Sequence, residues 1–143
     1  MNLALKEAKR AEKHGEVPVG AVLVHKNKLL ASACNLTIFR NDPTAHAEIL
    51  LLRKASTVLK NYRLGDTIMY VTMEPCAMCA GALLWARVKK VVFGCWDEKS
   101  GCLGSVLNFS QVRPFNHRLQ VLGGIMEEEC RQIVQNFFRS KRK

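Results

Sequence analysis

The sequence predicts an α/β fold, a three-layer α/β/α sandwich around a mixed five-stranded sheet. Short runs rich in Val, Ile and Leu alternate with longer segments whose apolar residues recur at helical spacing. Strand, helix, strand, helix and strand follow one another, which favours right-handed crossovers, parallel pairing and helices on both faces. The 143 residues contain no repeat, low-complexity stretch or linker, so we expect a single domain over 1–143.

The first quarter of the chain predicts a helix and then a hairpin. Residues 3–14 place Leu5, Ala8 and Ala11 on one helical face. Residues 17–25 form a nearly continuous apolar run, which indicates a largely buried strand. The polar residues 26–28 separate this run from a second strand at 29–34. The hairpin is expected to add an antiparallel edge to the sheet.

A second helix is expected to run from Asp42 and Pro43 to about Leu59. Asp42 suits the N-cap and Pro43 suits the first helical position. The remaining predicted elements are a strand at 67–72, a helix at 76–86, strands at 90–95 and 119–122, and a helix from 126 to the basic end. Ligands of such sheets bind outside the carboxyl ends of the strands, where the helices near 43 and 76 begin.

Two short motifs carry metal-binding chemistry, His46-Ala47-Glu48 and Pro75-Cys76-Ala77-Met78-Cys79. His46, Cys76 and Cys79 supply one imidazole and two thiols. Structural zinc sites close with four protein ligands, whereas catalytic sites use three and leave a position for water. We therefore expect these side chains to bind Zn²⁺, with Glu48 as the proton shuttle for an activated water.

The alternative is a structural zinc site closed by a distant fourth ligand, such as Cys95 or His117. No further Cys or His stands at ligand spacing, which argues against it. The combined pattern is typical of zinc deaminases, in which a glutamate that does not bind zinc acts as general acid and base.

Charge and hydropathy limit the classes of partner. The chain has 22 Lys and Arg against 12 Asp and Glu, a net charge of +10, which favours a polyanion such as nucleic acid. Solubility alone is the plainer reading of that charge. No run of about 18 apolar residues exists, so no membrane span is expected. The first residues lack the apolar core of a signal peptide, which predicts a cytoplasmic protein with reduced cysteines.

Further stretches extend the similarity beyond the metal motifs. On these residues the chain resembles the cytidine-deaminase-like superfamily and, within it, the bacterial tRNA-specific adenosine deaminases. The matching stretches are 15–22, 41–48, 70–76, 91–94, 116–118 and 137–138. The resemblance therefore implies a cytidine-deaminase-like fold over almost the whole chain.

The resemblance also implies a reaction and an assembly. Members of that family convert adenosine to inosine at the wobble position, A34, of the transfer RNA anticodon, as homodimers with one zinc per subunit. It implies that His46, Cys76 and Cys79 bind Zn²⁺ in this chain. Zinc-bound hydroxide would attack C6 of the adenine, Glu48 would shuttle the proton, and ammonia would leave. The implied partner is the anticodon stem-loop.

The resemblance implies substrate contacts at three positions outside the metal motifs, and Asn116 is a further candidate. By resemblance, Asn35 contacts the target nucleoside, and Asp97 and Lys99 line the RNA path. From the residues alone, Asn35 is better explained as a turn residue after a strand, and Asp97 could be an exposed loop acid. Asn116 either contacts RNA or braces a loop.

The carboxyl end, from Phe137 to Lys143, has two compatible interpretations. Cations at the end of a helix stabilise it through the helix dipole, with acidic residues 127–129 at its start. Phe138 followed by Arg139 also suits a flipped-out base and its phosphates. We expect both residues to bind substrate.

Two rival functions stay open at this stage. A deaminase of a free base or nucleoside, such as guanine or cytosine, explains the motifs but leaves the net charge and basic tail unexplained. A non-catalytic RNA-binding subunit with a structural zinc has no need for the shuttle glutamate, and Glu48 is present.

Overall fold

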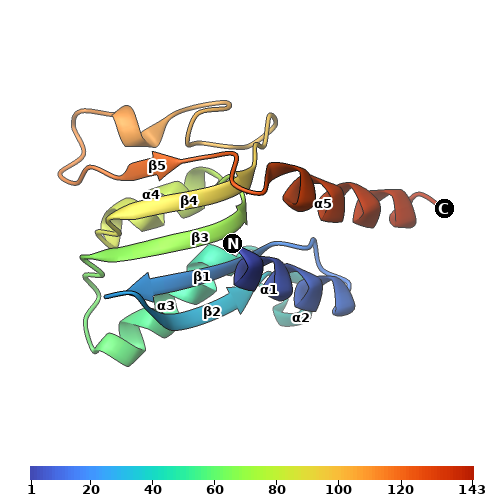
Figure 1. Cartoon of the computed structure of the whole chain (residues 1–143), viewed down its shortest axis with the longest axis horizontal. Helices are drawn as coiled ribbons and strands as arrows, with labels where there is room; N and C mark the ends of the chain where they lie inside the picture. The colour runs from blue at the N-terminus through green and yellow to red at the C-terminus, as the bar shows by residue number, and fades with distance from the viewer.

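The computed structural model describes residues 1–143 and confirms the predicted α/β class. The elements in chain order are α1 (Asn2–Lys13), β1 (Gly20–His25), β2 (Lys28–Cys34), α2 (Thr37–Arg40), α3 (Ala47–Leu59), β3 (Thr67–Met73), α4 (Ala77–Trp85), β4 (Lys90–Cys95), the 3₁₀ helix η1 (Phe109–Gln111), β5 (Gln120–Leu122) and α5 (Glu127–Lys141). The sheet lies between two helical layers, with α1 and α5 on one face and α3 and α4 on the other (Figure 1).

The five strands are ordered β2-β1-β3-β4-β5. β1 runs antiparallel to both of its neighbours, and β3, β4 and β5 are parallel to one another. The hairpin of β1 and β2 forms one edge of the sheet and pairs antiparallel to β3, which confirms the expected antiparallel edge. One consequence matters for the site. The carboxyl ends of β2, β3 and β4 all lie at the same end of the sheet, called the site edge below.

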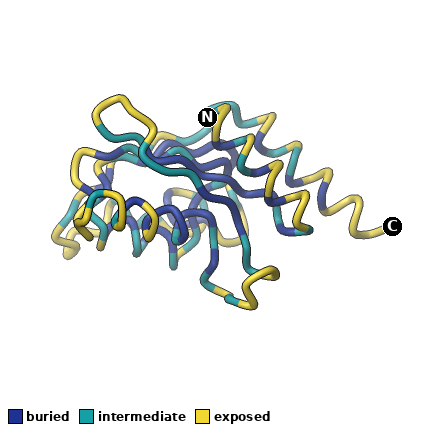
Figure 2. Tube along the Cα trace, turned by 90° about the horizontal axis from the view of Figure 1, so that it is seen from below, coloured by how far each residue is buried: buried dark blue, intermediate teal, exposed yellow.

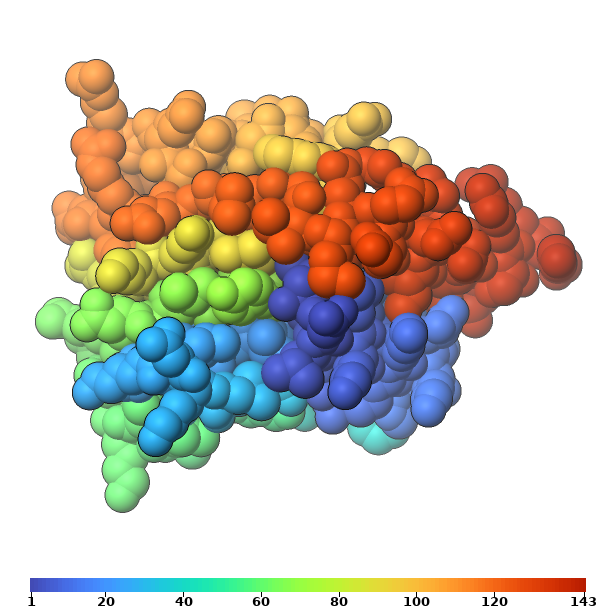
Figure 3. Space-filling model, viewed as in Figure 1, coloured from blue at the N-terminus to red at the C-terminus, as the bar shows by residue number.

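α1 packs unusually close to the sheet because its inner face carries only small side chains. Ala4, Ala8 and Ala11 are fully buried. A Cβ atom added to Gly20 in β1 would lie 2.1 Å from the Ala4 carbonyl oxygen and 2.3 Å from the Ala8 nitrogen, so only glycine fits there. α1 and the start of α5 lie side by side over the sheet (Figure 3).

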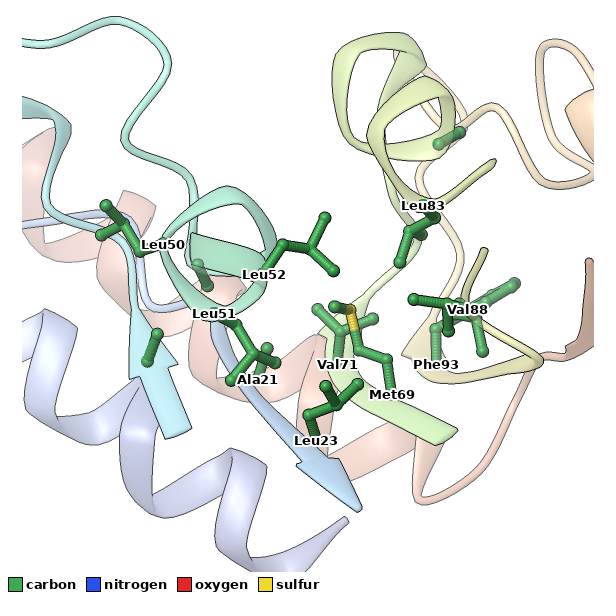
Figure 4. Packing of buried hydrophobic residues seen from close by; sticks show 14 of the residues in the cluster. Ala21, Leu23, Leu50, Leu51, Leu52, Met69, Val71, Leu83, Val88 and Phe93 are labelled. Carbon is green, nitrogen blue, oxygen red and sulfur yellow. The ribbon is translucent and has the colours of Figure 1, made fainter. Parts of the chain in front are cut away.

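The hydrophobic core fills the space between the sheet and the α3–α4 layer. Leu51 of α3 and Leu83 of α4 point toward Leu23, Met69 and Val71 of the central strands (Figure 4). All five side chains are completely buried. The strands form the buried centre of the molecule, whereas the outer helix faces and the end of α5 are exposed (Figure 2).

The start of α3 differs from the prediction. Asp42 Oδ1 accepts hydrogen bonds from the Thr44 nitrogen at 2.8 Å and from Thr44 Oγ1 at 2.7 Å, which closes a local turn. The helix begins only at Ala47, with His46 as its N-cap. Asp42 and Pro43 therefore belong to a turn, and the short helix α2 precedes it where no element was expected.

All six cysteines are free, and the four outside the metal motifs are buried. None of the helices combines the length and the apolar character that a membrane crossing requires.

Candidate active site

Three potential metal ligands meet at the site edge. His46 follows the loop after β2, Cys76 is the N-cap of α4, and Cys79 lies in the first turn of that helix. Their ligand atoms lie within 4.8 Å of one another. His46 Nδ1 is 3.7 Å from Cys76 Sγ and 3.6 Å from Cys79 Sγ. The structure thus brings together residues from two loops that are 30 or more positions apart.

The spacing of these atoms fits a tetrahedral zinc site. With the usual Zn–S and Zn–N bond lengths, a tetrahedral ion separates a nitrogen and a sulfur ligand by about 3.6 Å. Neither suggested fourth ligand joins the cluster. His117 Nε2 donates to the Val88 carbonyl at 2.6 Å, and Cys95 Sγ donates to the Thr72 carbonyl at 3.5 Å. The donor set is therefore of the three-ligand type that keeps a position for water.

The protonation states of the three ligands are coupled. Hydrogen bonding from Cys79, and next from His46, lowers the pKa of the Cys76 thiol to about 4. The interaction with Cys76, and then burial, raises the pKa of the Cys79 thiol. Hydrogen bonding to Cys76 likewise raises the pKa of His46. Thiolate and neutral imidazole are the forms that bind a metal, so metal binding competes with protons at Cys79 and His46.

Glu48 lies beside this cluster, in the first turn of α3. Its side chain is buried, and burial raises the pKa of the carboxyl group to about 6. The carboxylate also raises the pKa of the neighbouring Cys79 thiol. A carboxyl group with a pKa near neutrality can both accept and return a proton at physiological pH.

Asn35 fixes the start of α3. It follows β2, is buried, and its Oδ1 accepts a hydrogen bond of 2.8 Å from the Ala47 nitrogen. Ala47 stands between His46 and Glu48, so this bond sets the backbone that carries both groups. The amide oxygen is committed to this helix start, and the Nδ2 group is the donor left for a ligand.

Three of the expected substrate residues line one groove. Asp97, Lys99 and Phe138 surround a volume of about 650 Å³ between the loop after β4 and α5. Asp97 Oδ1 accepts hydrogen bonds from the Lys99 and Ser100 nitrogens at 3.0 and 3.2 Å, so it shapes the loop as well as lining the groove. Arg139 is exposed immediately after Phe138.

Asn116 lies away from this site. Its carbonyl oxygen accepts a hydrogen bond of 3.2 Å from Arg87, in the segment between α4 and β4. That segment lies at the end of the sheet opposite the site edge, because β4 and β5 begin there. The structure does not bring Asn116 to the metal ligands of its own chain.

Two buried carboxylates near the site were not predicted. Glu74 directly precedes Pro75 and bonds to the loop after β4, and Glu16 bonds to the Phe39 nitrogen and Thr37 Oγ1 at the start of α2. Glu16 is fully buried and Glu74 is 3% exposed. The available signal was an acidic residue within an apolar stretch, which is buried only when its oxygens are hydrogen-bonded.

Comparison with known proteins identifies relatives over the whole chain. The family model of MafB19-like deaminases matches residues 1–142. A tRNA-specific adenosine deaminase of Bacillus subtilis (strain 168) is 48% identical, over 100% of this chain and 89% of the relative. One from Haemophilus influenzae is 47% identical, over 99% of this chain and 83% of the relative. A solved structure from work on A-to-I editing by tRNA:A34 deaminases has a TM-score of 0.90 and 41% identity, over 93% of this chain and 96% of that one. The chain therefore belongs to the family of tRNA-specific adenosine deaminases.

Proposed function

We propose that this chain is a zinc-dependent hydrolase that converts adenosine to inosine at the wobble position, A34, of the transfer RNA anticodon. The observation that carries the proposal is the arrangement of His46, Cys76 and Cys79 at tetrahedral spacing beside buried Glu48. The relatives support the proposal because they are named as deaminases of transfer RNA and align with almost the whole chain.

Glu48 carries the proton transfers of the proposed reaction. Zinc held by His46, Cys76 and Cys79 supplies a water molecule of lowered pKa next to the substrate. The Glu48 carboxylate would take one proton from the attacking water, whose oxygen bonds to C6 of adenine, and would give that proton to the adjacent ring nitrogen. Glu48 would then carry the proton of the new C6 hydroxyl to the amine, and the bond between C6 and the amine nitrogen would break as ammonia leaves. Adenosine and water thereby yield inosine and ammonia.

The RNA is proposed to occupy the groove beside α5. Phe138 offers an aromatic face for a base, and Lys99 and Arg139 offer cations for phosphates. Asn35 Nδ2 is proposed to donate a hydrogen bond to the target nucleoside. The hydrogen bond from the Ala47 nitrogen to Asn35 Oδ1 holds the Asn35 amide in place for this role. The net charge of +10 supports a polyanionic substrate over a free base.

Two further properties belong to the proposal. A homodimer is supported by Trp85, which is 85% exposed beside a cavity of about 290 Å³ that Phe115 and Asn116 also line. We expect Trp85→Glu to shift the chain from dimer to monomer in light scattering, whereas a dimer that persists would exclude this face. A cytoplasmic location stays a prediction.

The substrate class is tested by comparing the candidate substrates one at a time. The zinc-loaded protein is incubated separately with an anticodon stem-loop carrying adenosine at the wobble position, with free adenosine, with cytidine and with guanine. We expect inosine in the stem-loop and no product elsewhere, and a stem-loop with guanosine at that position serves as the control. Turnover of guanine or cytidine, with the stem-loop left unreacted, would instead identify the chain as a deaminase of a free base or nucleoside.

A further inference from the structure

The Glu74 carboxylate accepts all of its hydrogen bonds from one loop. Oε1 accepts from the Leu103 nitrogen at 3.0 Å and from the Ser105 nitrogen at 2.9 Å. Oε2 accepts from the Asp97 nitrogen at 3.0 Å and from Ser105 Oγ. No lysine or arginine pairs with this carboxylate. Its charge is therefore compensated by the loop 97–105 itself, which we call the groove loop.

The groove loop also lies directly against the segment that carries the metal ligand Cys76. The Cys102 nitrogen donates to the Pro75 carbonyl at 2.9 Å, and Gly101 pairs with Cys76 in an isolated β-bridge. Glu74 is thus located where the backbone of the ligand segment meets the backbone of the groove loop.

Gly101 makes the position of the carboxylate possible. A Cβ atom at this residue would lie 2.3 Å from Glu74 Cδ and 2.3 Å from Oε2. Real Cβ atoms do not approach other atoms so closely, so the carboxylate and any larger residue at 101 exclude each other. The observed position of the Glu74 carboxylate therefore requires glycine at residue 101.

We propose that Glu74 is a positioning residue for substrate, which holds the groove loop so that Asp97 and Lys99 line the groove at a fixed distance from Cys76. The inference rests on the proposed function, since that function supplies the RNA that the groove receives. Ordering a loop upon binding costs conformational entropy. Because Glu74 orders the groove loop before the RNA binds, it strengthens the affinity for RNA.

This role predicts a separation of KM from kcat. Glu74 bonds to no residue of the proton-transfer machinery, and its partners are all in the groove loop. Release of the loop should weaken binding, because loop residues must then be ordered on the RNA. The step at C6 should continue at its usual rate once the RNA is bound.

The test uses Glu74→Gln in the full-length zinc protein. The amide keeps the volume of the carboxylate but presents an N–H₂ group to N–H donors. With charge-assisted hydrogen bonds lost, we expect the KM for the anticodon stem-loop to rise roughly tenfold while kcat changes by less than about twofold. Zinc should remain at one ion per chain. Glu12→Gln, the same change at an exposed position of α1, is the matched control.

Hydrogen exchange measures the loop without reference to activity. The amides of Asp97, Leu103 and Ser105 donate to Glu74, so they should exchange faster in Glu74→Gln than in wild type or Glu12→Gln. If wild type leaves the stem-loop unreacted, the proposed function fails by itself, and unchanged exchange at these amides overturns the role of Glu74 independently.

Two further variants leave the charge of Glu74 unaltered, and Ser105→Ala is the milder of the two. Gly101→Ala displaces the carboxylate and crowds the Asp97 carbonyl oxygen, and it should raise KM in the same direction as Glu74→Gln. Ser105→Ala removes one hydroxyl donor and should have a smaller effect on KM. Loss of kcat together with zinc, at unchanged KM, would show that Glu74 braces the metal site and would overturn the proposal, as would faster exchange without a change in KM.

Discussion

The end of α5 extends beyond the body of the protein and carries its cations into solvent (Figure 1). All four basic residues after Phe138 are exposed, and Phe138 lines the groove. We consider a variant in which all four basic residues are replaced by glutamine, because glutamine keeps the helix propensity and removes the four charges. The residues are Arg139, Lys141, Arg142 and Lys143.

The expected magnitude follows from counterion release. Each contact with a phosphate of single-stranded RNA adds about 0.7 to the slope of log affinity against log salt. Lys141 lies over the Phe137 ring, with Nζ 5.3 Å from the ring centroid, so it is the cation least disposed to reach a phosphate. Three or four contacts correspond to a slope reduced by about 2 to 3 and, at 0.1 M salt, to an affinity lower by roughly two to three orders of magnitude.

Fluorescence anisotropy of a labelled anticodon stem-loop, titrated at several salt concentrations, measures both quantities. The control variant also loses four positive charges, but from exposed lysines at the opposite end of the sheet. These are Lys26, Lys28, Lys60 and Lys89. We expect the control to keep most of the wild-type slope. Equal slopes for the two variants would refute docking through α5 and leave only the net charge as an attraction.

Three other predictions concern chemistry and stability. Glu48→Gln should keep one zinc per chain by elemental analysis and lose about 10² to 10⁴ in the rate of inosine formation; near-normal turnover would remove the shuttle role. Gly20→Ala should lower the free energy of unfolding by about 1 to 3 kcal/mol, because the new Cβ would overlap the Ala4 carbonyl, whereas exposed Gly65→Ala should change it by less than about 0.5 kcal/mol in the same denaturant titrations. Burial raises the pKa of the Cys130 thiol from 9.0 to about 12, so the unfolded chain ionises first as pH rises. The free energy of unfolding should therefore fall above pH 9 by about 1.4 kcal/mol per pH unit more in wild type than in Cys130→Ala, and parallel pH profiles would contradict this.

Most elements could be predicted from the sequence because their apolar patterns are local. The strand at 90–95 has the predicted bounds, α4 is one residue shorter than predicted at each end, and β5 begins one residue later than predicted. α2 has four residues and no buried side chain, so it leaves no periodic signal, and Glu16 holds its start from more than 20 positions away. The start of α3 was misplaced because Asp42 is satisfied by its own turn, a competition between two local structures that composition does not decide.

The site divides in the same way. The candidate metal ligands and Glu48 could be singled out because their residue types and spacing lie within short segments, and the structure brings His46, Cys76 and Cys79 together. Asp97 and Lys99 were expected on resemblance and Phe138 on its place before the basic end, and no periodicity places the loop after β4 beside α5. The bonds of Glu74 reach residues about 30 positions away, so only the folded chain reveals them. A buried acid is detectable in a sequence, but its partners are not.

The two segments that carry the candidate metal ligands lie on either side of α3 and β3. A bound ion therefore acts as a cross-link that closes a chain segment of 30 residues between His46 and Cys76. Closing such a segment restricts the unfolded chain, and metal affinity becomes part of the free energy of folding. Chelation should then lower the melting temperature as well as stop turnover, and free zinc concentration sets both.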